Sequence, residues 1–167
     1  MKKMTFLAVI GVLSLLLNTG CKKEAEAGVP AEATAFDPAA AKTTVEAGYR
    51  EFENAYNAKD SVALANCYAS DGKFMPPNMK AAEGRANIQK TFGQWFKGDT
   101  SKIKLSLVEL WGNETNLTAE NTWQITDKDG KVLDEGKSIE LYSMEDGKWK
   151  LLRDCFNSNM PAMPHEK

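Results

Sequence analysis

Apolar side chains recur every three or four residues after Asp37-Pro38, while charged residues fall between them. This spacing places one apolar stripe along a helix. Asp is favoured as an N-cap and Pro in the first helical turn. The pattern therefore predicts a helix from residue 38 to about residue 59, with a buried face made of Val45, Tyr49, Phe52 and Tyr56.

The next stretch predicts two further helices separated by a short strand. Asp60-Ser61 is expected to cap a short helix that Asp71-Gly72 ends, and residues 73–75 read as a strand stopped by Pro76-Pro77. Residues 78–83 form a polar loop, and Gly84-Arg85 leads into a third helix. Its predicted buried face consists of Ile88, Phe92, Trp95 and Phe96.

From residue 101 onward the period changes from helical to alternating, which is typical of strands. Residues 102–111, 115–126 and 131–144 alternate before a final strand at 149–158. The turn signals between these strands are Gly112-Asn113, Asp129-Gly130 and Asp146-Gly147. Helices followed by a strand meander predict an α+β domain, in which the sheet curls around the helices.

The final strand, residues 149–158, carries apolar residues on both of its faces. A strand of this kind belongs in the middle of a packed sheet rather than at an edge. Asp154 is the exception, because it is a carboxylate where packing alone favours an apolar residue. We therefore expect a functional site to include Asp154.

The first twenty residues have the pattern of a cleaved signal peptide. Lys2 and Lys3 precede an apolar run from Phe6 to Leu17 that is short for a membrane span. Cys21 follows at the position of a lipid-modified bacterial cysteine, although Leu17 lies one residue further back than is usual. The alternative is an ordinary secretory signal that leaves a free cysteine.

Residues 22–36 contain little to bury, so we interpret residues 21–36 as a lipid anchor and flexible tether. Residues 37–160 form the predicted domain, and the Pro-rich residues 161–167 form a disordered tail. Two acyl chains would tether the protein stably to a membrane. The expected location is the bacterial cell envelope, either in the periplasm or at the outer membrane.

The charge balance argues against nucleic acid as a partner. Residues 21–167 hold 19 of the 21 basic residues and all 23 acidic residues, so their formal net charge is −4. A nucleic-acid-binding protein needs a basic face.

Two cysteines, Cys67 and Cys155, remain after Cys21. They could form a disulfide in an oxidising compartment, but we expect them to be unpaired because a domain of this size does not require a bridge.

Several motifs resemble the SnoaL-like and ketosteroid-isomerase-like branch of the nuclear transport factor 2-like superfamily, including its uncharacterised lipoproteins. They lie in order over roughly residues 40–160, at 52–60, 68–72, 84–88, 147–151 and 153–158. The resemblance implies a cone-shaped roll of three N-terminal helices packed on a curved, mostly antiparallel sheet. Because this cup serves isomerases, cyclases, dehydratases and binding modules, the fold does not specify a reaction.

The catalytic set of the ketosteroid isomerases is only partly matched. The resemblance places Phe52 where that family has a tyrosine, and Met75 or Pro76 where it has a carboxylate base. Only Glu140 falls near the position of the family's protonated acid. Isomerase chemistry of that type is therefore not expected.

Period-two alternation suggests which residues face the cup. Glu140 shares a face with Tyr142 on one strand, and Asp154 with Leu152 on the next. Two carboxyl groups in a partly dry pocket raise at least one pKa, which suits acid–base chemistry. The predicted pocket residues are Asp154, Glu140, Tyr142, Phe156, Leu152, Gln124, Phe52 and Tyr56.

Two alternatives remain open for these carboxylates. Reversed parity would turn Ile139 and Leu141 inward and leave Glu140 in solvent. Asp154 could instead have a structural role, paired with Arg153, Arg85 or a helix-end amide.

The opposite sheet face is a candidate partner surface. Thr122 and Gln124 are expected to face the cup, which turns Trp123 and Ile125 outward. The resemblance implies that this face could form a homodimer.

Other chemistries lack the residues they need. His165 is the single histidine and lies in the tail. We therefore expect no Ser-His-Asp site, no metal site and no cofactor.

The sequence favours an exported lipoprotein that binds a small organic ligand in its cup. The alternatives are a small lyase or isomerase using Asp154, and an envelope accessory protein that binds a partner.

Overall fold

The computed structural model describes residues 36–161. The predicted signal peptide, the lipid anchor at Cys21, nearly all of the tether and nearly all of the tail lie outside these residues. None of the helices within residues 36–161 combines the length and the apolar composition needed to cross a membrane.

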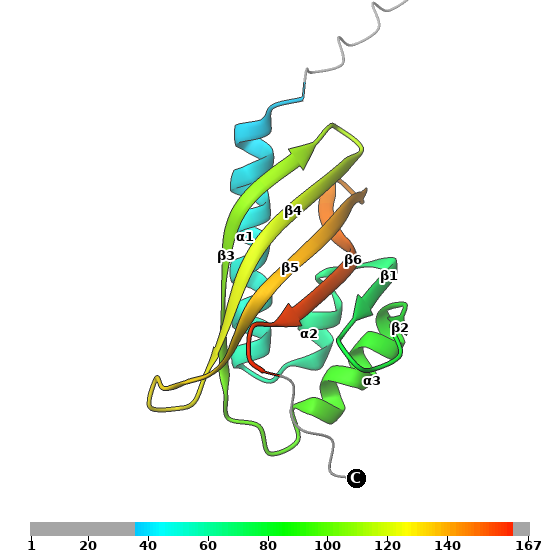
Figure 1. The fold of residues 1–167 in the computed structure, drawn as a ribbon. Helices are drawn as coiled ribbons and strands as arrows, with labels where there is room; N and C mark the ends of the chain where they lie inside the picture. The colour runs from blue at the N-terminus through cyan, green and yellow to red at the C-terminus, as the bar shows by residue number, and fades with distance from the viewer. Residues whose placement is uncertain (1–35, 162–167) are drawn as a thin grey trace, which may run out of the picture. The chain divides into compact units, whose positions relative to one another are not determined.

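Three helices lie on one side of a single sheet (Figure 1). They are α1 (Pro38–Asn57), α2 (Ser61–Ala65) and α3 (Arg85–Trp95). The predicted N-caps are confirmed, since the Asp37 carboxylate accepts from the Ala39 and Ala40 amides, and Asp60 caps α2 in the same way. These carboxylates satisfy amide groups that have no partner within the helix.

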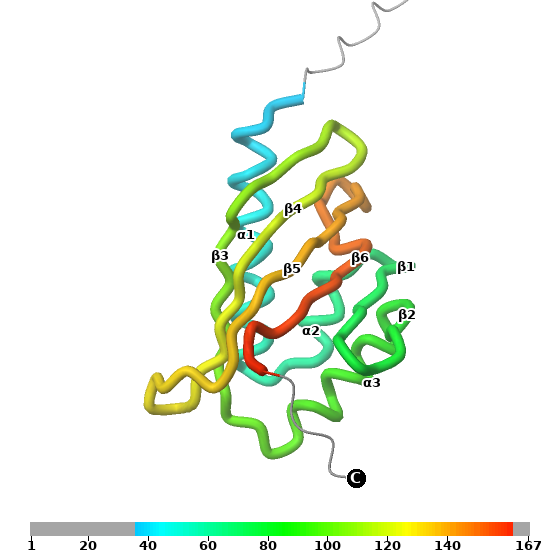
Figure 2. Tube along the Cα trace, in the orientation of Figure 1, coloured from blue at the N-terminus to red at the C-terminus, as the bar shows by residue number. Residues whose placement is uncertain are grey.

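The sheet has six strands in the order β2-β1-β6-β5-β4-β3, which Figure 2 shows across the molecule. Only β1 and β6 are parallel, and every other neighbouring pair is antiparallel. The final strand β6 lies inside the sheet between β1 and β5, as its two apolar faces predicted. The strands are β1 (Tyr68–Met75), β2 (Ala82–Glu83), β3 (Lys102–Gly112), β4 (Asn116–Thr126), β5 (Val132–Glu145) and β6 (Lys148–Ser158).

The core fills the space between the helices and the inner face of the sheet. The α1 stripe is buried, together with Leu64 of α2 and Ile88 and Phe92 of α3. The α+β class and the mostly antiparallel sheet are therefore confirmed. The turn predictions are also confirmed, with positive φ values at Gly112, Gly130 and Gly147.

The first strand differs from the prediction. β1 begins at Tyr68, five residues before the predicted start, so Asp71-Gly72 lies inside a strand rather than at a helix end. The β1–β6 register is irregular between Tyr68 and Lys73. A Cβ at Gly72 would lie 2.9 Å from the Ala69 and Leu151 carbonyl oxygens, so this irregular stretch requires glycine. The predicted loop at 78–83 also ends in the short strand β2.

Both cysteines within residues 36–161 are free, as expected. Cys155 is exposed, because it points to the outer face of β6, while Cys67 is partly buried.

Candidate functional site

The inner face of the sheet and the helices enclose a cavity of about 260 Å³. Its walls are mainly aromatic, and its polar side chains are three carboxylates and one serine hydroxyl besides the Tyr56 phenol. Preformed cavities of this type, with few polar groups, are typical ligand sites. The aromatic lining consists of Phe52, Tyr56, Phe74, Phe92, Trp95, Trp123 and Phe156.

Strand register places two carboxyl groups side by side at one end of this cavity. Glu140 of β5 is the direct cross-strand partner of Asp154 of β6. Such partners have Cβ atoms about 5 Å apart and point to the same face. Both side chains are more than nine-tenths buried, and both line the cavity.

Glu140 accepts two phenolic hydrogen bonds on one carboxylate oxygen. Tyr142 donates to Oε2 at 2.7 Å, and Tyr49 of α1 donates to the same atom at 3.0 Å. Ser138 lies 3.4 Å from Oε1, but its hydroxyl has a shorter bond, of 2.6 Å, to Asn121. A hydroxyl has a single proton to donate. Oε1 of Glu140 therefore keeps acceptor capacity toward the cavity.

Asp154 accepts one hydrogen bond, from the Tyr68 hydroxyl to Oδ2 at 2.6 Å. No other side chain or amide within residues 36–161 donates to its second oxygen, Oδ1. Because Asp154 lines the cavity, this oxygen is available to a bound molecule.

Burial and proximity raise the pKa of both carboxyl groups. Burial raises the pKa of Asp154 most, and the neighbouring Glu140 charge raises it further, to about 7. Burial also raises the pKa of Glu140, but the hydrogen bonds from Tyr142, Asn121 and Tyr49 oppose this. Glu140 therefore ionises first, and Asp154 keeps a proton close to neutral pH.

The phenols around the pair stay protonated. Burial, followed by the nearby carboxylates, raises the pKa of Tyr49, Tyr68 and Tyr142 well above its usual value. Each phenol is therefore a hydrogen-bond donor to a carboxylate.

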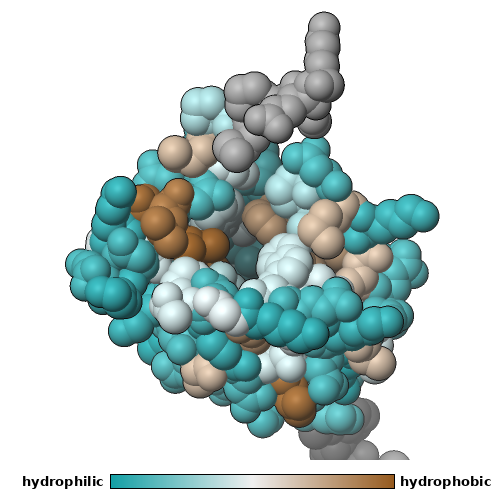
Figure 3. Space-filling view, turned by 90° about the horizontal axis from the view of Figure 1, so that it is seen from below, coloured by the Kyte–Doolittle hydropathy of each residue, from teal (hydrophilic) through white to brown (hydrophobic). Residues whose placement is uncertain are grey.

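The cavity opens toward the side of the molecule that holds the β4–β5 turn (Figure 1 and Figure 3). Asp134, close to the β4–β5 turn, lines the cavity, as do the exposed side chains of Met79 and Trp95. Figure 3 looks toward this end and shows a hollow with apolar residues at its rim. The hollow in Figure 3 therefore gives a ligand access to the cavity from solvent.

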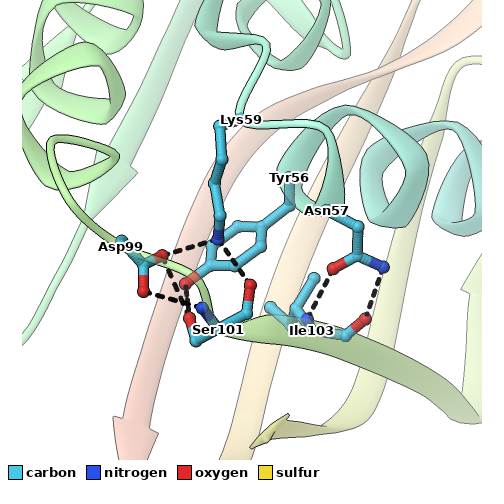
Figure 4. A network of polar contacts seen from close by, with 6 residues as sticks. All are labelled: Tyr56, Asn57, Lys59, Asp99, Ser101 and Ile103. Atoms are coloured by element: carbon cyan, nitrogen blue, oxygen red, sulfur yellow. Dashed lines mark hydrogen bonds and ion pairs between the residues drawn. The ribbon is translucent and has the colours of Figure 1, made fainter. Parts of the chain in front are cut away.

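A polar cluster fixes Tyr56 and the start of β3 beside the cavity (Figure 4). The Lys59 ammonium lies 2.6 Å from Asp99 Oδ2, 2.5 Å from the Ser101 carbonyl oxygen and 4.4 Å from the centre of the Tyr56 ring. Burial raises the pKa of Asp99, but the hydrogen bond from Lys59 and those from Ser101 outweigh it, so the net shift is downward. This cluster holds the cavity wall in place.

Five of the predicted pocket residues line the cavity together. The inward parity of β5 is settled, because Ile139 and Leu141 are 45% and 41% exposed on the outer face. Tyr142 does not line the cavity, but its hydroxyl donates a hydrogen bond to Glu140. The five lining residues are Asp154, Glu140, Phe156, Phe52 and Tyr56.

The predictions for Leu152 and Gln124 were wrong. Tyr142 pairs with Leu151 and Leu141 pairs with Arg153, so Leu152 is an extra residue in a β-bulge. The bulge interrupts the alternation, and Leu151 joins the core instead.

Strand β4 has the opposite parity to the one expected. Trp123 and Ile125 line the cavity, while Gln124 and Thr122 lie in a groove on the outer face. Trp123 and Ile125 therefore cannot form the predicted partner surface.

Asp154 does not form an ion pair with Arg153 or Arg85, so this part of the structural alternative is wrong. Arg153 donates to the carbonyl oxygens of Asp71 and Leu152. Arg85 donates to the Tyr68 carbonyl oxygen and pairs with Glu145.

Tyr49, Tyr68 and Asn121 are site residues that the sequence predictions did not assign. Tyr49 lies on the predicted apolar stripe of the first helix, and a phenol on a buried stripe needs a partner. Asn121 interrupts the buried row of β4, which was a usable signal. Nothing in the spacing of Tyr68 indicated its bond to Asp154.

Of the two positions where the resemblance to ketosteroid isomerases placed the base, Pro76 lines the cavity and Met75 ends β1. No group of three His, Cys, Asp or Glu side chains within the described residues could hold a metal ion.

The SnoaL-like domain family model matches residues 49–152, which is more than half of the chain. The chain belongs to the SnoaL-like domain family. Solved structures agree with a nuclear transport factor 2-like fold. No curated protein sequence matches the chain.

Three similar structures illustrate the range of proteins with this fold. A ketosteroid isomerase-like protein from Erwinia carotovora is 21% identical, with a TM-score of 0.60 over 71% of this chain and 96% of that one. A domain of unknown function with a cystatin-like fold from Nostoc punctiforme is 11% identical, with a TM-score of 0.67 over 75% and 81%. A Catenulispora acidiphila protein in complex with S-DNPA is 16% identical, with a TM-score of 0.63 over 72% and 95%. At these identities the likeness shows the fold of the SnoaL-like domain.

Proposed function

We propose that this SnoaL-like domain binds a small organic molecule in its inner cavity, with Glu140 and Asp154 as the polar anchor. The observation that carries this proposal is the cavity of about 260 Å³, in which an aromatic lining converges on two buried carboxyl groups.

The cavity offers both affinity and orientation. Burying an apolar ligand surface gains roughly 25 cal/mol per Å², and aromatic walls add specific ring contacts. Glu140 Oε1 and the unpaired Asp154 oxygen then fix the polar end of the ligand. Core phenols already hold the carboxyl groups in position, so binding requires little reorganisation.

Native mass spectrometry of the protein purified from several expression hosts tests the proposal. A bound small molecule is expected in the wild type and is expected to be lost in Leu105→Trp, which fills the cavity from β3. A matched Val108→Trp change on the exposed side of the same strand is expected to retain it. Finding nothing bound in any host would contradict the proposal.

The raised pKa of Asp154 favours one alternative, a small lyase or isomerase. A carboxyl group with a pKa of about 7 can both donate and accept a proton near neutral pH. Once a ligand is identified, Asp154→Asn is expected to retain binding of a neutral ligand but abolish turnover. Turnover that survives this change would exclude Asp154 as the acid–base group.

Export and lipid anchoring are proposals that rest on residues 1–21. We propose that the first twenty residues direct export and that Cys21 carries the lipid, which would place the domain in the cell envelope. Radiolabelled palmitate should label the wild type and not Cys21→Ser. Labelling of both would contradict the anchor.

A further inference from the structure

The cavity carries an unbalanced negative charge. Asp134, Glu140 and Asp154 line it, and none of the described lining residues is Lys, Arg or His. Buried charges in proteins are normally paired or bind an ion, because removing them from water is costly. Glu140 and Asp154 have phenolic hydrogen bonds but no cationic partner among the described residues.

Three basic side chains of the domain have their partners elsewhere. Arg153 precedes Asp154 in the strand but points to the other face, where it contacts the Asp71 carbonyl oxygen. Arg85 pairs with Glu145, and Lys59 pairs with Asp99. The negative end of the cavity therefore remains available to a positive group on a ligand.

The walls are suited to the same kind of group. Phe74, Trp123 and Phe156 line the same cavity as the carboxyl pair, and Phe74 is the cross-strand partner of Asp154. Phe156 is stacked with Phe74 at 5.6 Å and lies edge-on to Trp123 at 5.7 Å. Aromatic faces attract cations through the ring quadrupole, most strongly where water is excluded.

We infer that the cavity binds an organic cation, a protonated amine on a compact apolar body, with the ammonium group at Glu140 and Asp154. This inference rests on the proposed function, since it specifies the chemical class of the same ligand. The ammonium would donate to Glu140 Oε1 and Asp154 Oδ1, while the apolar body would contact the aromatic walls. An organic anion would be repelled by the Glu140 carboxylate, and a neutral ligand would leave that buried charge unpaired.

Matched ligand pairs test the inference on the purified protein by isothermal titration calorimetry. Each pair contains an amine and the alcohol of the same shape, such as benzylamine and benzyl alcohol, 1-naphthylmethylamine and 1-naphthylmethanol, and 1-adamantylmethylamine and 1-adamantylmethanol. The best amine is expected to bind at least about tenfold more tightly than its alcohol.

Variants locate the ammonium group. Glu140→Gln and Asp154→Asn are expected to weaken amine binding by about tenfold each and to leave alcohol binding within about threefold. Glu120→Gln is the matched control, because Glu120 pairs with Ile139 in the register and so belongs to the outer face. It should leave both affinities unchanged.

The outcomes separate the two proposals. Alcohols that bind as tightly as the amines would overturn the cation inference and leave the proposed function standing. Amine binding that is insensitive to both cavity variants would also overturn it. No binding by any member of any pair would overturn the proposed function as well.

Discussion

At the residue scale, the two central carboxyl groups are neighbours but have unequal surroundings. Glu140 receives hydrogen bonds from Tyr49 and Tyr142, whereas Asp154 receives only that of Tyr68. Hydrogen bonds favour the ionised form, so Glu140 ionises first and its charge then opposes ionisation of Asp154. One side chain acts as a fixed charge, and the other can exchange a proton.

The Asp154→Asn variant is expected to gain stability relative to the wild type as the pH rises. The folded state raises the pKa of Asp154 from 3.8 to about 7, so its contribution to stability is complete below the lower value and is lost as the pH rises through the upper one. Asparagine can still accept the Tyr68 hydroxyl and carries no charge.

Urea unfolding over a pH series measures this effect. The free energy of unfolding of the variant, relative to the wild type, should rise by roughly 2–4 kcal/mol between about pH 4 and about pH 8. Parallel curves for the two proteins would show that Asp154 does not titrate as described.

At the element scale, the sequence predicted the helices, the turns and the central position of β6, but not every inward-facing residue. The apolar spacing of a helix and the Asp-Gly turns depend only on residues close together in the chain, so they can be recognised in the sequence. The face of a strand depends on register, and the extra residue Leu152 in β6 reverses it. No local pattern marks this bulge.

Strand β4 illustrates a different reason for error. Its apolar residues, including Trp123 and Ile125, alternate with Thr122 and Gln124 and would have indicated the correct face. A polar cup would require the opposite parity, with Thr122 and Gln124 facing inward. The cavity is in fact aromatic along its walls and polar mainly at the carboxyl pair and at Asp134.

Gly136→Ala is expected to disrupt the cavity wall. A Cβ at this position would lie 2.1 Å from the Asn157 carbonyl oxygen and 2.4 Å from the Trp123 ring, so a strand or the ring must move. Overpacking of this kind costs roughly 1–3 kcal/mol. Thermal unfolding should therefore show a lower Tm.

Gly48→Ala provides the matched control for that measurement. A Cβ at Gly48 meets nothing within 4 Å, and alanine stabilises a helix interior by roughly 0.5–1 kcal/mol relative to glycine. Its Tm should rise slightly. A Gly136→Ala protein as stable as the wild type would contradict the described packing of Trp123.

At the scale of the whole molecule, the helices cover one face of the sheet and leave apolar side chains on the other. Trp111, Ile139 and Leu141 are each more than 40% exposed. Trp111 and Leu141 both pair with Thr118, so they lie in one row across the sheet. We propose that this outer face, rather than Trp123 and Ile125, forms a homodimer.

Analytical ultracentrifugation tests the proposed dimer. Leu141→Lys is expected to shift the protein from dimer to monomer, because a lysine would be placed in the apolar row. Val62→Lys changes an exposed apolar residue on α2, away from the sheet, and should leave the dimer intact. A wild type that remains monomeric at every concentration would contradict the proposal.

The carboxyl pair and its cavity are the centre of this account, and carbon-13 NMR of the Asp154 side chain tests them most directly. Titration of the free protein should give a pKa of about 7, which falls toward its usual value in Glu140→Gln because the neighbouring charge is removed. A bound amine should lower the pKa of Asp154 in the wild type, because a nearby cation favours the carboxylate. A carboxyl group that titrates near 3.8 and responds to neither the substitution nor the amine would contradict the account.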